Sequence, residues 1–202
     1  FQEAPNVYPV DFDGFYERKD VKDLATRFFD GIGLGVEEIL QKSDLYDRQG
    51  KNPHAFSTDI DREGDIRILC NLRNNEQWMG TLLHELGHAV YNRYTNPAIP
   101  YLIRTEAHAF TTEGVAIFFE AMSTNAHWMH SALGLNDDQT RRIDEASSRY
   151  QRLKQLIFAR WALLMYEFEK NRYANPDQAL SAAWWRLVEK SQLVSRPAGR
   201  TQ

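Results

Sequence analysis

Cysteine is nearly absent from this sequence, and long apolar segments are missing. The single cysteine, Cys70, excludes an intrachain disulfide framework and a metal site made of several thiolates. Any zinc would therefore have to be held by histidine and carboxylate side chains. No apolar run approaches the roughly 20 residues that a membrane-spanning helix requires, so the sequence predicts no membrane span.

Positive charge is not concentrated in any part of the chain. The 24 lysine and arginine residues are interspersed with 28 aspartate and glutamate residues, and the formal net charge is −4. Without a basic stripe, nucleic acid is not expected as a main partner. The chain also lacks internal repeats and low-complexity tracts. With 202 residues, 43% of them hydrophobic, it is long enough to bury a sizeable core as one domain.

What the sequence does contain is TLLHELGHAV at residues 81–90, with two histidines four positions apart. An α-helix turns once in about 3.6 residues, so His84 and His88 would project from one face. Two imidazoles placed in this way can both reach one zinc ion, at about 2.0–2.1 Å. Glu85, directly after the first histidine, can face a water molecule held there. This is the HExxH arrangement of zinc peptidases.

The residues around this motif predict that it lies on a helix. Asn74 is a plausible N-cap, and Gln77 follows it at the spacing of a capping box. The segment reaches Asn96-Pro97, where a helix is expected to stop. Apolar residues recur at intervals of three and four, at Trp78, Leu82, Leu83, Leu86, Val90 and Tyr91.

The rest of the chain is predicted to be mostly helical. Residues 54–72 differ, because two β-prone runs flank the turn-like DREG at 61–64, and Ile66, Ile68 and Cys70 recur at every second position. We expect a β-hairpin there. The predicted fold is mainly α with a small antiparallel hairpin beside the HExxH helix. Helical patterns cover the other segments, at 19–33, 35–46, 105–123, 137–171 and 176–191.

A catalytic zinc site usually has three protein ligands, so the two histidines need a further partner. The extended pattern HExxHxxGxxH would place glycine and histidine where this chain has Tyr91 and Tyr94, which excludes that class. A glutamate from a following helix remains. The segment RTEAHAFTTEGVAIFFE at residues 104–120 offers Glu106, Glu113 and Glu120, with His108 as a lesser candidate.

Glu113 is the favoured third ligand. Gly114 follows it, and a small residue there would let this segment come close to the metal helix. Glu106 is more simply a solvated charge at the start of a helix. Glu120 lies seven residues after Glu113 on the same helix face, where it could orient a ligand.

Taken together, these stretches resemble a known group of peptidases. RILCNLRNNEQWMGTLLHELGHAVY at 67–91 and TEGVAIFFEAMST at 112–124 are similar to the catalytic core of the angiotensin-converting enzyme family, and of thimet oligopeptidase and oligopeptidase F. These families are gluzincins. The likeness includes HAFSTDIDREGDIRI before this core and AMSTNAHWMHSALGL after it, so that it covers residues 54 to about 135.

The resemblance implies specific roles for several residues. His84, His88 and Glu113 would be the zinc ligands, and Glu85 the catalytic base. His54 and Ala55, which correspond to the start of the family's hairpin motif, would lie on a strand that pairs with the backbone of the substrate. An exposed hairpin edge beside the metal helix can hold an extended peptide in this way.

One position departs from the angiotensin-converting enzyme pattern. That family has an aspartate four residues after its glutamate ligand, and this chain has Ile117 there. The carboxylate that orients a zinc ligand must then come from another position. Glu120 is the candidate, as in the oligopeptidase pattern.

The resemblance implies a zinc metallopeptidase that hydrolyses short peptides, similar to an oligopeptidase or a dipeptidyl carboxypeptidase. The alternative is a zincin-like metal-binding or regulatory module without catalysis. We expect one catalytic domain over residues 1–202, with the hairpin, HExxH helix and glutamate helix in 54–123 and a helical lobe in 124–202. The chain starts at Phe1 and ends in SRPAGRTQ, so we expect a piece of a longer peptidase whose other part is a further partner besides the peptide.

Overall fold

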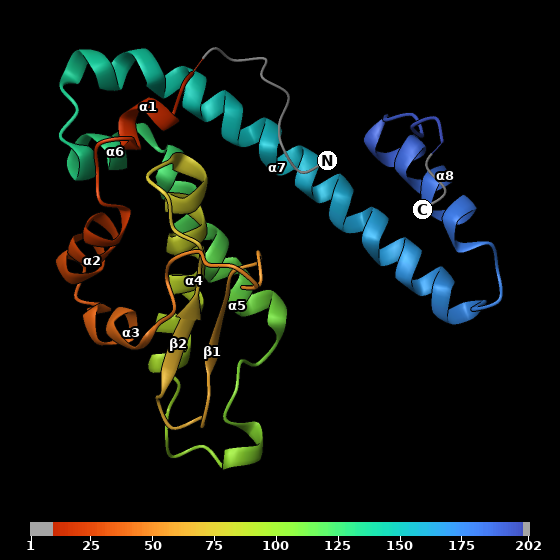
Figure 1. Cartoon of the computed structure of the whole chain (residues 1–202), viewed down its shortest axis with the longest axis horizontal. Helices are drawn as coiled ribbons and strands as arrows, with labels where there is room; N and C mark the ends of the chain where they lie inside the picture. Colours follow the sequence, from red (N-terminus) through yellow and green to blue (C-terminus); the bar gives the residue numbers. More distant parts are fainter. Residues whose placement is uncertain (1–9, 200–202) are drawn as a thin grey trace. The chain divides into compact units, whose positions relative to one another are not determined.

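Helices dominate the computed structural model, which describes residues 10–199 (Figure 1). The predicted fold class, mainly helical with one small antiparallel sheet, is confirmed. Among the described residues, no helix combines the length and the apolar composition that crossing a membrane requires. In chain order the elements are α1 (Asp13–Tyr16), α2 (Val21–Gly31), α3 (Glu37–Lys42), β1 (Phe56–Asp59), β2 (Ile66–Leu69), α4 (Glu76–Arg93), the 3₁₀ helix η1 (Tyr101–Ile103), α5 (Ala109–Glu120), the 3₁₀ helix η2 (Ala121–Thr124), α6 (Ala126–Leu133), α7 (Asp137–Ala174) and α8 (Leu180–Gln192).

The chain divides into two compact units, which are described separately. Val10–Ser147 form the larger one, called the site unit below, and the described residues from Ser148 onward form the C-terminal unit. The boundary falls within α7, whereas the sequence suggested a helical lobe that begins at residue 124. The assignment of residues 1–202 to a single catalytic domain stays a prediction.

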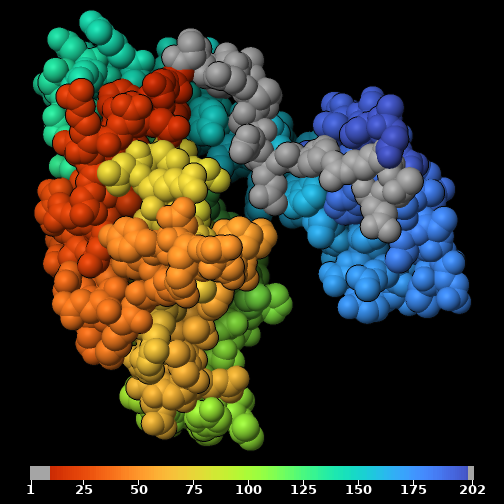
Figure 2. All heavy atoms as spheres, in the orientation of Figure 1, coloured from red at the N-terminus to blue at the C-terminus, as the bar shows by residue number. Residues whose placement is uncertain are grey.

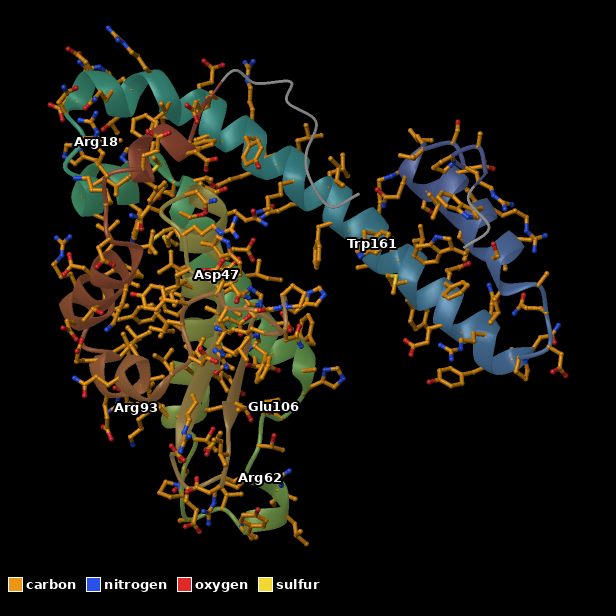
Figure 3. All side chains as sticks on the ribbon, in the orientation of Figure 1. Arg18, Asp47, Arg62, Arg93, Glu106 and Trp161 are labelled. Carbon is orange, nitrogen blue, oxygen red and sulfur yellow. The ribbon has the colours of Figure 1, made fainter. Side chains whose placement is uncertain are left out.

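The C-terminal unit has its own small core between α8 and the part of α7 that belongs to this unit. Leu164, Trp185 and Val188 are buried there. Trp161, labelled in Figure 3, packs its ring edge to face against that of Trp184, with 5.6 Å between the ring centres. No histidine of the sequence lies beyond residue 130, so the predicted zinc ligands all belong to the site unit.

α4 is the central helix of the site unit. Apolar residues occupy most of its circumference, so it can be covered on several sides at once. It contacts α2, α5 and both strands (Figure 1). Its fully buried side chains are those of Met79, Leu82, Leu83, Leu86 and Ala89. The HExxH motif therefore lies on a helix that the surrounding core holds in place.

α4 begins at a different cap from the one that the sequence suggested. Asn75, not Asn74, is the N-cap, with extended backbone and a side-chain oxygen that accepts the N–H of Trp78 at 2.9 Å. A cap oxygen bonds the amide two or three residues ahead, which from Asn75 is Trp78. The predicted capping box with Gln77 is therefore wrong. The helix ends at Arg93, shortly before the expected stop at the following Asn-Pro pair.

β1 and β2 form the predicted hairpin, and their antiparallel register pairs Ser57 with Ile68. Ile66 and Ile68 of β2 are buried. A parallel bridge between Asp44 and Leu69 covers the second edge of β2. Within the described residues, β1 pairs with β2 alone, so its other edge has no strand partner. Figure 2 shows the segment that contains the hairpin, in orange to gold, on one face of the site unit.

His54 and Ala55 do not lie on a strand, because β1 begins at Phe56. Pro53 precedes them, and the backbone N–H of His54 donates to the side-chain oxygen of Asn52 at 3.0 Å. This Asx-type turn gives the backbone a bend, so extended pairing starts only after it. The prediction that these two residues are part of the strand is corrected, and they stand immediately before it.

The helices predicted after the HExxH segment are present with changed bounds. The one expected at 105–123 is α5, which starts at Ala109 and continues as the 3₁₀ helix η2. The long helix expected at 137–171 is α7, and the last is α8. His108 explains the later start of α5, since its side chain caps the helix by accepting the N–H of Phe110 at 3.0 Å.

Candidate metal centre

Gly87 allows α4 and α5 to lie in direct contact. A Cβ atom at residue 87 would lie only 2.7 Å from the Cα of Ala116 and 3.2 Å from the ring of Phe119. Gly114, to which the sequence pattern assigned this role, is exposed, and a Cβ there would meet no atom within 4 Å. The assignment to Gly114 was wrong, because that glycine does not point at α4. The close approach depends on Gly87.

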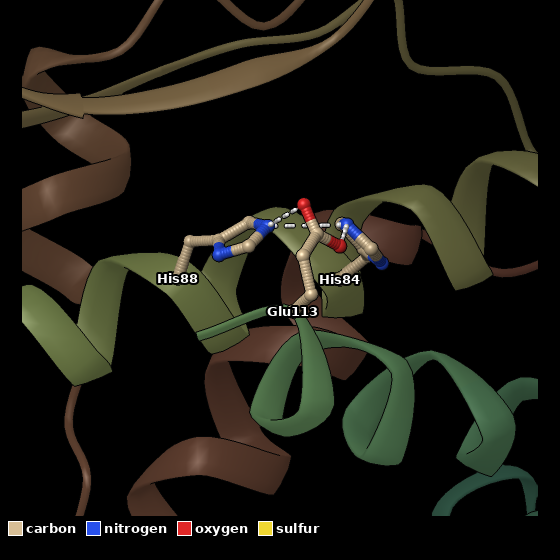
Figure 4. Close-up of side chains that lie close together, drawn as sticks. All are labelled: His84, His88 and Glu113. Carbon is tan, nitrogen blue, oxygen red and sulfur yellow. Dashed lines mark hydrogen bonds and ion pairs between the residues drawn. The ribbon is translucent and has the colours of Figure 1, made fainter. Parts of the chain in front are cut away.

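His84, His88 and Glu113 come together between α4 and α5 (Figure 4). The Nε2 atoms of the two imidazoles are 3.2 Å apart, and the Glu113 carboxylate lies 3.5 Å from the first and 3.6 Å from the second. Ligands arranged tetrahedrally at about 2.0–2.1 Å from zinc would be about 3.3–3.4 Å from one another. The two nitrogens lie close to this spacing, the two carboxylate distances end on different oxygens of Glu113, and the three side chains could hold a metal ion together.

The outer nitrogen of His84 faces Glu120. Nδ1 of this imidazole lies 3.1 Å from the carboxylate, which comes from the last residue of α5. Burial acts to lower the pKa of His84. The hydrogen bond and the charge of Glu120, together with the charges of Glu85 and Glu113, outweigh burial and raise the pKa. Glu120 thus lies where the sequence expected a carboxylate that orients a zinc ligand, and that role stays a prediction.

The outer nitrogen of His88 faces a hydroxyl group that the sequence did not single out. Nδ1 lies 2.7 Å from Oγ1 of Thr112, the residue directly before Glu113 on α5. Burial lowers the pKa of His88, and the neighbouring His84 lowers it further, against the opposing charge of Glu113. Each imidazole of the cluster therefore has one nitrogen toward Glu113 and the other toward a polar group of α5.

Glu85 is buried beside this cluster, with 7% of its surface exposed. Burial raises the pKa of its carboxyl to about 7, and the charges of Glu113 and Glu120 act in the same direction. The charge of His84 and the backbone N–H of Ser57 on β1 act against this rise. A group with a pKa near neutral can both accept and release a proton at physiological pH.

The two other candidates for the third ligand lie outside the cluster. His108 uses its side chain as the cap of α5. Glu106 lies on the loop before that helix and accepts a hydrogen bond from the hydroxyl of Thr105 at 2.6 Å. Its charge still acts on His88, so it contributes to the field of the site without joining the ligand cluster. The described residues that could hold a metal as a group are His84, His88 and Glu113.

A polar cavity of about 390 Å³ lies beside β1. It lies between β1, the hairpin turn, the end of α4 and the loop before α5. Arg62 and Glu106, both labelled in Figure 3, line it from the hairpin turn and from that loop. Ser57 lines the same cavity and also turns its backbone N–H toward the Glu85 carboxyl. Ser57 is therefore the residue that the cavity and the surroundings of Glu85 have in common, and Glu85 itself does not line the cavity.

The chain is similar in sequence to known proteins. Residues 35–200 match the model of peptidase family M3. An angiotensin-converting enzyme of Haematobia irritans exigua is 27% identical over 201 residues, which cover 94% of this chain and 30% of that protein. The oligopeptidase PepF of Bacillus subtilis (strain 168) is 30% identical over 89 residues, which cover 41% of this chain and 13% of that protein.

The fold has a counterpart among solved structures. A crystal structure assigned to an oligoendopeptidase F of Bacillus anthracis str. Ames superposes with a TM-score of 0.58 and 17% sequence identity. The match covers 89% of this chain and 30% of that structure. The chain therefore spans less than a third of the length of each of these three proteins.

Proposed function

Because the chain belongs to peptidase family M3, we propose that it carries the catalytic site of a zinc-dependent peptidase that hydrolyses short peptides. The observation that carries the proposal is the cluster of His84, His88 and Glu113 on two adjoining helices, whose potential ligand atoms lie within 4.8 Å of one another. Two nitrogen ligands and one carboxylate are a donor set that catalytic zinc sites use, with the fourth position left for water. The names of the relatives, an angiotensin-converting enzyme and an oligopeptidase, support a peptide substrate.

Zinc, when bound, would lower the pKa of a water molecule to about 7 and polarise the carbonyl of the peptide bond. The chain's own contribution to proton transfer is Glu85. Its carboxylate takes the proton of the attacking water and delivers it to the leaving amine. In the metal-free protein, burial of Glu85 favours the protonated carboxyl, and the charge of a bound zinc ion would favour the carboxylate that accepts the proton of the water.

The edge of β1 is the proposed binding surface for the peptide. A peptide added there as an extra strand would use the backbone groups that no strand of the described chain occupies. It would run past Glu85, since Ser57 on this edge faces that carboxyl. His54 and Ala55 stand just before the strand, so contact between them and one end of the peptide remains part of the proposal.

The relatives suggest a further partner. The chain spans less than a third of their length, so we propose that it works together with the remainder of a longer peptidase. That remainder would supply the other side of the substrate channel and would restrict access to short peptides.

The test is the substitution Glu85→Gln, which removes the base but keeps the size of the side chain. Zinc content measured by metal analysis should stay at the wild-type level, while cleavage of a peptide panel followed by mass spectrometry should fall at least about 100-fold. Glu37→Gln, an exposed change on α3, is the control and should leave both unchanged. A Glu85→Gln variant with full cleavage would show that the base assignment is wrong.

The wild-type protein also separates this proposal from the alternative. Zinc bound with turnover supports a peptidase. Zinc bound without cleavage, by this chain and also by the longer peptidase that contains it, would favour a non-catalytic metal-binding module, and absence of zinc binding would contradict both proposals.

A further inference from the structure

The Nδ1 atoms of the two histidines of the cluster, which face away from Glu113, contact different chemical groups. Nδ1 of His84 faces the Glu120 carboxylate at 3.1 Å, whereas Nδ1 of His88 faces the Thr112 hydroxyl at 2.7 Å. Thr112 is buried, with 8% of its surface exposed. A buried hydroxyl at this distance from a ring nitrogen is a full hydrogen-bond partner. Neither motif spacing nor the family match assigns a role to it.

The tautomer of His88 depends on this contact. A neutral imidazole carries its proton on one nitrogen and a lone pair on the other. Nε2 of His88 points to His84 and Glu113, so it must keep the lone pair if it is to bind a metal. The proton must then be on Nδ1, where it needs an acceptor. The Thr112 oxygen is the group in position to accept it.

We propose that Thr112 is a positioning residue that fixes the tautomer and ring orientation of His88 and thereby strengthens zinc binding at this site. The inference rests on the proposed zinc site. Acceptors behind ligating histidines typically improve metal affinity by roughly 10- to 100-fold. Here the acceptor is a neutral hydroxyl, so it holds the ring without adding a negative charge near the cluster.

The helix geometry explains why this hydroxyl is well placed. Thr112 lies four residues before Ala116, so both project from the same face of α5. Ala116 is the residue that meets Gly87, the neighbour of His88 on α4. The contact that sets the distance between the helices therefore also sets the distance from Thr112 to His88. Because threonine is branched at Cβ, its side chain is restricted to two main rotamers in a helix, and the contact with Nδ1 of His88 fixes the one observed.

The test compares Thr112→Val with Thr112→Ser in the full chain. Valine keeps the shape and removes the acceptor, while serine keeps the hydroxyl and removes the methyl group. Zinc affinity is measured by competition with a chromophoric chelator. The proposal expects affinity to fall roughly 10- to 100-fold in the valine variant and by less than about threefold in the serine variant. Equal affinity of valine variant and wild type would overturn it.

If Thr112 had a purely structural role, the serine variant would be impaired more than the valine variant, which is the opposite of the order that the proposal expects. If the residue only fills space, serine leaves a small cavity and is the more harmful change, while valine is tolerated. Thermal unfolding of the metal-free variants checks that both fold. Nitrogen-15 NMR of the zinc-loaded protein gives a direct readout, because a protonated Nδ1 of His88 should be protected from exchange in wild type and serine variant and lose that protection with valine.

Failure of this inference can be told apart from failure of the proposed function. A wild-type chain that binds no zinc would contradict both. If wild type and the valine variant bind zinc with the same affinity, only the proposed role of Thr112 is contradicted, and the proposed function stands. Cleavage activity is not needed for either conclusion.

Discussion

Glu85 is a carboxyl group in a place that disfavours its charge. Burial raises its pKa to about 7 from an ordinary value of 4.5. In the metal-free protein the folded state therefore holds this proton more tightly than the unfolded chain does. The stabilisation from the neutral carboxyl is complete below about pH 4.5, and it is lost as the pH rises through about 7.

This titration predicts a pH-dependent effect of Glu85→Gln on stability. Glutamine is never charged, so the metal-free variant should gain stability relative to wild type between about pH 5 and about pH 8, by up to about 3 kcal/mol. Urea unfolding of both proteins in the presence of a chelator measures the difference. A difference that stays constant over this range would show that the carboxyl titrates as in an unfolded chain.

The residues of the site could be predicted to different extents. His84, Glu85 and His88 follow from the periodicity of a helix, and the structure places Glu113 and Glu120 beside them, as expected from spacing. Their chemical roles stay predictions. The contact with Thr112 could not be foreseen, because a threonine belongs to no motif and its partner is decided by how two helices cross.

At the scale of elements, the contact between α4 and α5 is the feature on which the site depends. The prediction concerns Gly87→Ala, whose Cβ would lie 2.7 Å from the Ala116 backbone. The helices must move apart, which should lower the free energy of unfolding by roughly 1–3 kcal/mol. Zinc affinity should fall as well, since Glu113 would move away from the two histidines. Urea unfolding and chelator competition measure the two effects.

Gly114→Ala is the matched control on the opposing helix. A Cβ there meets no atom within 4 Å, and alanine suits a helix interior better than glycine does. The free energy of unfolding of this variant should be higher than that of wild type by roughly 0.5–1 kcal/mol, so that its urea midpoint is also higher. If both alanine variants behaved alike, the close contact at residue 87 would not be the constraint that the structure indicates.

The sequence pattern predicted which helices and strands are present more accurately than it predicted where they end and what they contact. The hairpin was expected over 54–72, but its strands are Phe56–Asp59 and Ile66–Leu69, because the turn at Asn52 delays the first one. The choice between Asn74 and Asn75 as cap depends on backbone angles that a pattern does not contain. The role of Gly87 was missed because α4 is apolar on most sides, so periodicity does not say which side meets α5.

At the scale of the whole chain, the site unit contains every residue of the candidate site, together with the partners Thr112, Glu120 and Ser57. The C-terminal unit packs around Leu164, Trp185 and Val188. We therefore predict that a polypeptide of residues 10–147 folds and binds zinc within about threefold of the full chain, since each proposed ligand and its packing are retained. Circular dichroism melting and chelator competition test this.

A polypeptide of residues 148–202 is the companion control. It contains no histidine, so it should bind no zinc at the concentrations used. Loss of cooperative melting in the 10–147 polypeptide would show that the site unit needs the rest of α7 for folding.

The exposure of side chains on α5 could not be predicted from the sequence. The helix is apolar nearly all round, which usually indicates a helix buried on all sides. Phe110 and Phe118 are nevertheless 79% and 61% exposed. Burial of such a helix depends on which elements surround it, and that is a property of the assembled molecule, not of the local pattern.

A side chain at residue 87 would clash with backbone atoms of α5, and this limits which second mutations can compensate for it. The Cα and the amide nitrogen of Ala116 are present whatever amino acid occupies that position. No second-site replacement at residue 116 can make room, so a selection that starts from a bulkier residue 87 should recover activity chiefly by reversion to glycine. Laboratory evolution of this scaffold would have to treat that codon as fixed while its neighbours vary.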